Sequence, residues 1–190
     1  ETSLFRKVTN KMINMSVTLD QFGKEKKVNE LLELLVMELI NSDSDFSFYS
    51  FDGKSELLTV EYLKVTSSIT TMSTAFRNCS KLTQLDVSNW DTSNVQRMNY
   101  MFAYCPKLTQ LDASKWNTKN VTNMTYMFTG CSSLITLDLS TWDTSSVTQF
   151  NNIFNSCEKI TEIKLNNQFV TAKATNIKQM FYNCYKLVSV

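Results

Sequence analysis

Residues 121–145 read VTNMTYMFTGCSSLITLDLSTWDTS, and variants of this stretch recur along the chain. The recurrence is marked by cysteines separated by 26, 26, 26 and 27 residues: Cys79, Cys105, Cys131, Cys157 and Cys184. A phenylalanine stands three residues before each of them, at Phe76, Phe102, Phe128, Phe154 and Phe181. Self-similarity at a fixed period of about 20–50 residues is the signature of a stacked repeat protein. The sequence therefore predicts a solenoid, in which each repeat buries its apolar side chains against its neighbours.

The half of each repeat that precedes the cysteine predicts a helix. Apolar residues stand 10, 7, 4 and 3 positions before the cysteine, and in the middle repeat they are Val121, Met124, Met127 and Phe128. Together with the cysteine, these positions form one face of an α-helix.

The half that follows the cysteine predicts a strand. It has the pattern L-x-x-L-x-L, as in Leu134, Leu137 and Leu139, and the last two positions alternate as in a strand. The runs WDTS, WNTK and WDTS then indicate a turn into the next repeat. Adjacent strands lie about 4.8 Å apart and packed helices about 8–10 Å apart, so the stack should bend. We predict an α/β fold, a right-handed leucine-rich-repeat-like solenoid with a parallel concave sheet and convex helices.

These repeats resemble the BspA-like leucine-rich repeats of bacterial surface proteins. They are similar above all to the variety with Met-Phe and Trp-Asp-Thr signatures, first catalogued as a domain of unknown function in mycoplasma lipoproteins. The resemblance covers about Ile69 to Val190. It implies a surface-exposed adhesion or recognition role, commonly in Gram-positive or mycoplasma-like bacteria and their phages, and it implies no catalytic residue. A fold and a role remain separate claims.

The fourth repeat departs from the pattern. Gln168 stands in place of the tryptophan, Lys164 in place of the recurrent aspartate, and one residue is added before Cys184. We expect this repeat to be locally irregular. The chain ends in the expected strand 186–190, which would leave an open apolar edge, so we expect further sequence to follow it.

Residues 1–65 lack the repeat. Leucines at helical spacing predict an amphipathic helix from about Lys24 to Asn41. Aromatic residues precede Asp52-Gly53 and apolar residues follow it, which predicts a hairpin whose second arm supplies the first strand of the solenoid. The expected organisation is an N-terminal helix plus hairpin cap at residues 1–65 and repeats of about 26 residues at 66–190. A separate functional domain within 1–65 remains an alternative.

Composition excludes several classes of function. Lys plus Arg number 19 and Asp plus Glu number 18, so no strong charge favours nucleic acid as a partner. The sequence contains no histidine and three glycines, which argues against an enzyme, a metal site or a phosphate-binding cofactor site. No apolar stretch is long enough for insertion into a membrane. No C-x-x-C pair exists, and the expected helices would hold neighbouring cysteines too far apart for disulfides, so we expect free, buried thiols.

The candidate binding site lies on the expected concave sheet. The outward positions of each strand carry polar residues in rows from repeat to repeat: Gln84, Asp86, Gln110, Asp112, Thr136, Asp138, Glu162 and Lys164. Like charges on adjacent strands are expected to raise one another's pKa and to attract a cation or a partner's Lys or Arg. The alternative is a solvated face on which each aspartate bonds to a nearby Ser or Thr. The tryptophans could form a carbohydrate platform, although their position matches the buried corner of a leucine-rich coil.

The leading hypothesis is a non-catalytic recognition or adhesion module at the bacterial cell surface. It would bind a protein or a glycan through the repeat solenoid. The alternative is a structural or receptor-binding part of a phage tail or another assembly, which would place it in a virion.

Overall fold

The computed structural model describes residues 51–60 and 65–190. All of the described residues belong to one compact unit of the chain, Asp45–Val190. The helix expected over Lys24–Asn41 and the first arm of the expected hairpin, up to residue 50, lie outside the described residues.

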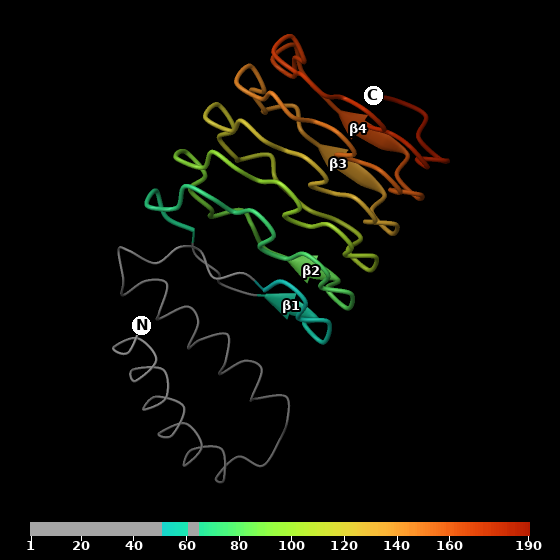
Figure 1. The fold of residues 1–190 in the computed structure, drawn as a ribbon. Helices are drawn as coiled ribbons and strands as arrows, with labels where there is room; N and C mark the ends of the chain where they lie inside the picture. The colour runs from blue at the N-terminus through green and yellow to red at the C-terminus, as the bar shows by residue number, and fades with distance from the viewer. Residues whose placement is uncertain (1–50, 61–64) are drawn as a thin grey trace. The chain divides into compact units, whose positions relative to one another are not determined.

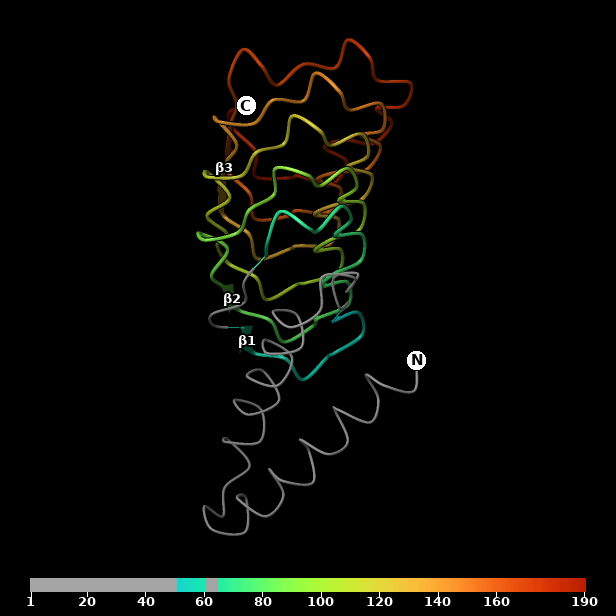
Figure 2. The same cartoon turned by 90° about the vertical axis from the view of Figure 1, so that its left-hand side faces the viewer.

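The described residues form coils that lie one above another (Figures 1 and 2). Short strands lie on one side of the coils: β1 (Thr59–Val60), β2 (Gln84–Leu85), β3 (Thr136–Asp138) and β4 (Glu162–Lys164). β1 pairs with β2 and β3 pairs with β4, both in parallel, with Thr59 opposite Gln84 and Leu137 opposite Ile163. The predicted parallel strands are therefore confirmed, although each has only two or three residues. We number the coils by their phenylalanines, from coil 0 (Phe51) to coil 5 (Phe181).

The expected helices are absent, because residues 51–60 and 65–190 contain no α-helix. The segment before each cysteine, which we call the turn side, is instead a series of overlapping β-turns. In coil 1, the N–H of Ala75 donates to Met72 O (3.2 Å) and the N–H of Cys79 donates to Phe76 O (3.3 Å). The helical prediction is wrong in this half of every repeat.

Backbone conformation explains the difference. Thr74 and Asn78 have φ angles of 61° and 62°, at the third residue of the two turns that end at Ala75 and Cys79. A positive φ at this position is typical of a type II turn and cannot continue a right-handed helix. Each turn places its first and last residues, which are three positions apart, in the core. Successive turns therefore produce nearly the same apolar spacing as a helix.

The turns also bond to the next coil. In coil 1, the N–H groups of Met72, Thr74 and Phe76 donate to Arg97, Asn99 and Met101 in coil 2, at 2.8–2.9 Å. Along this segment, one N–H group donates within a turn and the next donates to the neighbouring coil. None of these N–H groups is therefore buried without a hydrogen-bond partner. The predicted bend assumed helices about 8–10 Å apart. Since backbone hydrogen bonds on the turn side join successive coils directly, that cause of bending is absent.

The core is built from columns of identical residues. Successive Phe rings from Phe76 to Phe181 are stacked with centroids 5.5–5.8 Å apart. Trp90, Trp116 and Trp142 form a second stack, with centroids 5.7 and 6.0 Å apart, and none is more than 4% exposed. The tryptophans are therefore buried corners, which excludes them as a carbohydrate platform.

All five cysteines are free, as predicted, and all are buried except Cys184, which is partly buried. Each thiol donates to the carbonyl oxygen of the phenylalanine in the preceding coil, as in Cys131 Sγ to Phe102 O at 3.2 Å. Burial raises the pKa of the Cys131 thiol to about 12. Helices do not keep neighbouring cysteines apart as expected, however, because no layer of helices separates the coils.

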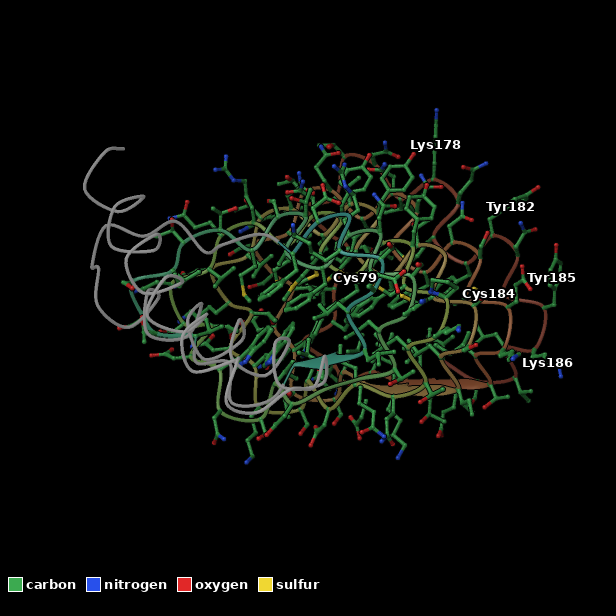
Figure 3. All side chains as sticks on the ribbon, turned by 90° about the horizontal axis from the view of Figure 1, so that it is seen from below. Cys79, Lys178, Tyr182, Cys184, Tyr185 and Lys186 are labelled. Carbon is green, nitrogen blue, oxygen red and sulfur yellow. The ribbon has the colours of Figure 1, made fainter. Side chains whose placement is uncertain are left out.

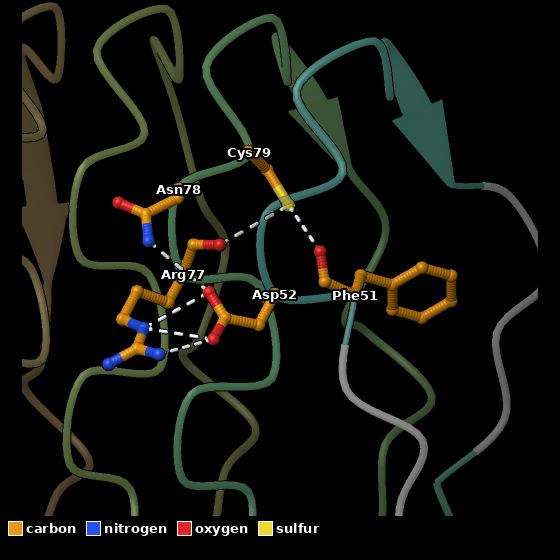
Figure 4. A network of polar contacts seen from close by, with 5 residues as sticks. All are labelled: Phe51, Asp52, Arg77, Asn78 and Cys79. Atoms are coloured by element: carbon orange, nitrogen blue, oxygen red, sulfur yellow. Dashed lines mark hydrogen bonds and ion pairs between the residues drawn. The ribbon is translucent and has the colours of Figure 1, made fainter.

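The repeat geometry reaches back to Phe51, before the expected start at residue 66. Phe51 stacks on Phe76 at 5.1 Å, and its carbonyl oxygen accepts the Cys79 thiol (Figure 4). Asp52 forms an ion pair with Arg77 and accepts a hydrogen bond from Asn78 Nδ2 (Figure 4). Asp52-Gly53 thus lies in the turn of a coil that bonds to coil 1, and β1 supplies the first strand as expected.

Coil 4 is packed differently at the position where the sequence departs from the repeat. Gln168, in place of tryptophan, is exposed. Phe169 instead packs on Phe150, with centroids 5.7 Å apart and planes at 45°. The tryptophan stack therefore ends at Trp142.

Candidate functional site: the strand-side row

The candidate residues lie where the alternation of the strands places them. Between the outward positions, the inward side chains of Leu85, Leu111, Leu137 and Ile163 are 1–7% exposed. The outward ones are fully or partly exposed, and we call them the strand-side row: Gln84, Asp86, Gln110, Asp112, Thr136, Asp138, Glu162 and Lys164. Strands β2, β3 and β4 carry most of the row, and residues 110–112 continue it without a regular strand.

Each aspartate of the row closes a local turn. Oδ1 accepts a hydrogen bond from the N–H group two residues later: Ser88 N to Asp86 (2.9 Å), Ser114 N to Asp112 (3.1 Å) and Ser140 N to Asp138 (3.0 Å). The Ser114 and Ser140 hydroxyls donate to the same oxygens at 2.6 Å. This is the local bonding that the sequence left open as an alternative, and it holds the carboxylates in a fixed orientation.

Electrostatics differ from the expectation. The serine hydrogen bonds hold the pKa of Asp86, Asp112 and Asp138 below the ordinary value. At Asp112 the Asp138 charge acts in the opposite direction, but it is the weakest of the named influences. The predicted raising by a like charge is thus present at Asp112, but the net pKa shift is downward, because hydrogen bonding to the charged form outweighs repulsion at exposed positions.

Lysines lie close to the acidic part of the row. Lys115 lowers the pKa of both Asp86 and Asp112 by its charge. Asp138 pairs in register with Lys164, and Lys164 Nζ lies 3.9 Å from Asp138 Oδ2. The row therefore changes from acidic in coils 1–3 to mixed in coil 4.

The turn side carries surface residues that the sequence reasoning missed. Tyr100 and Tyr126 stack with centroids 4.8 Å apart and planes at 7°, and Tyr104 nearby is 48% exposed. The helical prediction did not reveal these tyrosines, since the residues that share a surface differ between a helix and a series of turns. Asn78, Gly130 and Asn183, one residue before the cysteine, were the available signal, because Asn and Gly tolerate a positive φ.

Neither a metal site nor a membrane-spanning helix is found in the described part. No group of three or more His, Cys, Asp or Glu there could hold a metal ion. No helix there is long and apolar enough to cross a membrane.

A family model matches most of the chain, including all of the repeats. The model of the family described as "Mycoplasma protein of unknown function, DUF285" matches residues 49–162 and 111–189. The chain belongs to this family. A crystal structure of a leucine rich cell surface protein from Faecalibacterium prausnitzii A2-165 aligns with 70% of the chain at 20% identity and a TM-score of 0.44. The chain spans 39% of that protein's length. No curated protein matches the chain.

Proposed function

We propose that this DUF285 protein is a non-catalytic recognition or adhesion module of the bacterial cell surface, which binds a protein or a glycan through the strand-side row. The observation that carries the proposal is the row itself: polar side chains recur at the outward positions of coils 1–4, and backbone hydrogen bonds on the turn side keep these coils aligned. Fixed side chains lose little entropy on binding, which favours a specific contact.

The chemistry of the row suggests a partner with basic or donor groups. Asp112 and Asp138 are ionised at neutral pH and are held by serines on one side, while their carboxylates remain at least partly accessible. A row of this kind suits the Lys or Arg side chains of a protein, or the hydroxyl groups of a sugar.

The test compares two pairs of aspartates with the same charge. The double variant Asp112→Asn/Asp138→Asn alters the row, and Asp91→Asn/Asp143→Asn alters the turn after the tryptophan, where Oδ1 accepts the same kind of bond from Ser93 N and Ser145 N. Asparagine keeps the turn, because Asn117 Oδ1 accepts the equivalent bond from Lys119 N. We expect the first pair to weaken binding to a panel of extracellular matrix proteins and a glycan array by at least about ten-fold, and the second to leave it unchanged. Equal binding by both variants would exclude the row.

A further inference from the structure

Three tyrosines occupy strained backbone positions on the turn side of coils 2 and 3. The φ angles of Tyr100, Tyr104 and Tyr126 are 58°, 62° and 57°. The equivalent positions elsewhere in the repeats hold mainly smaller residues: Thr74, Asn78, Gly130, Asn152, Ser156, Gln179 and Asn183. Bulky residues rarely adopt a positive φ, and such strain is typically retained at functional sites.

The tyrosine stack is closed at one end. Arg77, in coil 1, lies over the Tyr100 ring with Cζ 6.0 Å from the centroid, and Asp52 holds the guanidinium by an ion pair. The opposite face of Tyr100 stacks on Tyr126. Both faces of Tyr100 are therefore occupied.

The other end of the stack is open. The next residue in this column is Asn152, which is 5% exposed and turns its side chain inward, where Oδ1 accepts a hydrogen bond from Asn155 Nδ2 (2.7 Å). Within residues 65–190, no aromatic ring continues the stack beyond Tyr126. The Tyr126 face that is directed toward coil 4 is thus left without a covering side chain from its own column.

Polar side chains occupy three columns of coil 4 that lie close in the repeat to the Tyr126 column. Asn151 Oδ1 accepts a hydrogen bond from Thr125 Oγ1 (3.1 Å), and Ser156 Oγ donates to Asn155 Oδ1 (2.7 Å). Asn151, Asn155 and Ser156 are all partly exposed, and each has donor or acceptor capacity beyond these bonds. In coil 4, the residues one position before and three and four positions after the Tyr126 column therefore carry uncharged amides and a hydroxyl.

A pyranose ring matches this combination, because it has an apolar C–H face and a rim of hydroxyl groups. Aromatic faces bind apolar surfaces, while amides and hydroxyls exchange hydrogen bonds with a sugar's hydroxyls. We propose that Tyr126, with Asn151, Asn155 and Ser156, forms a binding site for a neutral hexopyranose unit of a glycan. The uncharged amides and hydroxyl of coil 4 favour a sugar over a protein partner, because a protein hot spot is typically ringed by apolar contacts.

This site is separate from the strand-side row. Lys178, which continues the Asn151 column in coil 5, lies on the side of the coils away from the strands (Figure 3). Gly130 leaves room for the Tyr104 ring, because a Cβ at residue 130 would lie 2.9 Å from Tyr104 Cδ1. The two binding sites can therefore be tested independently.

The test uses the full chain with a glycan array of neutral oligosaccharides, followed by NMR titration of the strongest binder. Tyr126→Asn removes the ring and introduces the residue that coil 4 holds at the same position, so the fold should persist. We expect its affinity to fall by at least about ten-fold. Tyr126→Phe, which keeps the ring, should stay within about three-fold.

Three outcomes would overturn the proposal: no neutral oligosaccharide bound more tightly than about 10 mM, equal affinity for Tyr126→Asn and the unaltered protein, or binding of proteins only. Asp112→Asn/Asp138→Asn separates this site from the proposed function. If that variant binds sugar normally and loses a protein ligand, both proposals stand. If it loses the sugar while Tyr126→Asn does not, the sugar binds at the row.

Discussion

Coil 3 and coil 5 contain equivalent residues in different surroundings. Met124, Phe128 and Leu137 of coil 3 are at most 1% exposed, whereas the matching Ile177, Phe181 and Val190 of coil 5 are 36–60% exposed. Both phenylalanines stack on Phe154, at 5.8 and 5.5 Å. The difference is that coil 3 has a neighbour on each side, so burial in this protein is supplied by neighbouring coils more than by the coil itself.

The backbone shows the same contrast. The Phe128 N–H donates to Ile153 O in the next coil at 2.9 Å, and the Phe154 N–H donates to Met180 O at 3.0 Å. No described residue accepts a hydrogen bond from the Phe181 N–H. The stability of a coil should therefore depend on how many of its two faces are covered.

The largest expected effect is on the phenylalanine column. Phe128→Ala should lower the free energy of unfolding by about 3–5 kcal/mol, because it opens a cavity between two coils. Phe181→Ala should cost less than half as much, since its side chain is already partly in water. Urea denaturation followed by circular dichroism measures both values. Equal losses would show that the coils do not depend on their neighbours in this way.

An intermediate effect is expected for the buried threonines that join the middle coils. Thr92 is 1% exposed, and its hydroxyl donates to Asn117 O (3.0 Å) and accepts from Asn117 N (2.9 Å). Thr92→Val should cost about 1–3 kcal/mol, because both backbone groups lose their partner in a dry site.

Thr175→Val, at the end of the stack, is the matched control for Thr92→Val. The Thr175 hydroxyl also bonds to the preceding coil, at Thr148 O (3.1 Å), but the residue is exposed. Water can replace this bond, so the change should stay within about 0.5 kcal/mol. A loss at Thr175 as large as that at Thr92 would contradict the dependence on burial.

The smallest expected effect concerns acid. The pKa of Asp86, Asp112 and Asp138 is lower in the folded protein than the ordinary value, so their stabilisation is present above about pH 4 and is lost as the pH falls through the folded pKa. Coil 4 has Lys164 at this position and makes no such contribution. The triple variant Asp86→Asn/Asp112→Asn/Asp138→Asn should therefore show a shallower fall in melting temperature than the unaltered protein between about pH 5 and 3. Parallel curves would mean that the serine bonds do not favour the charged carboxylates.

The candidate sites could be predicted from the sequence to different degrees. Alternation around Leu111 and Leu137 was enough to place the strand-side row on the surface, because side-chain direction in a strand follows directly from residue number. The sequence could not decide whether Ser114 donates hydrogen bonds to Asp112, since an aspartate two residues before a serine can either accept a local hydrogen bond or face a partner. The tyrosine stack could not be predicted, because the faces of a coil depend on its turns.

The sequence by itself determined the repeat, its register and its core columns. A period of 26 residues brings like residues together in any stacked coil, whatever the local backbone, and the cysteine and phenylalanine columns follow from it. Only the tertiary structure decided between helix and turns on the other half of each coil. Helices and successive type II turns share nearly the same apolar spacing, and the choice depends on the distance between coils, which is set by the stacked rings and by the hydrogen bonds from Met72 to Arg97 and onward.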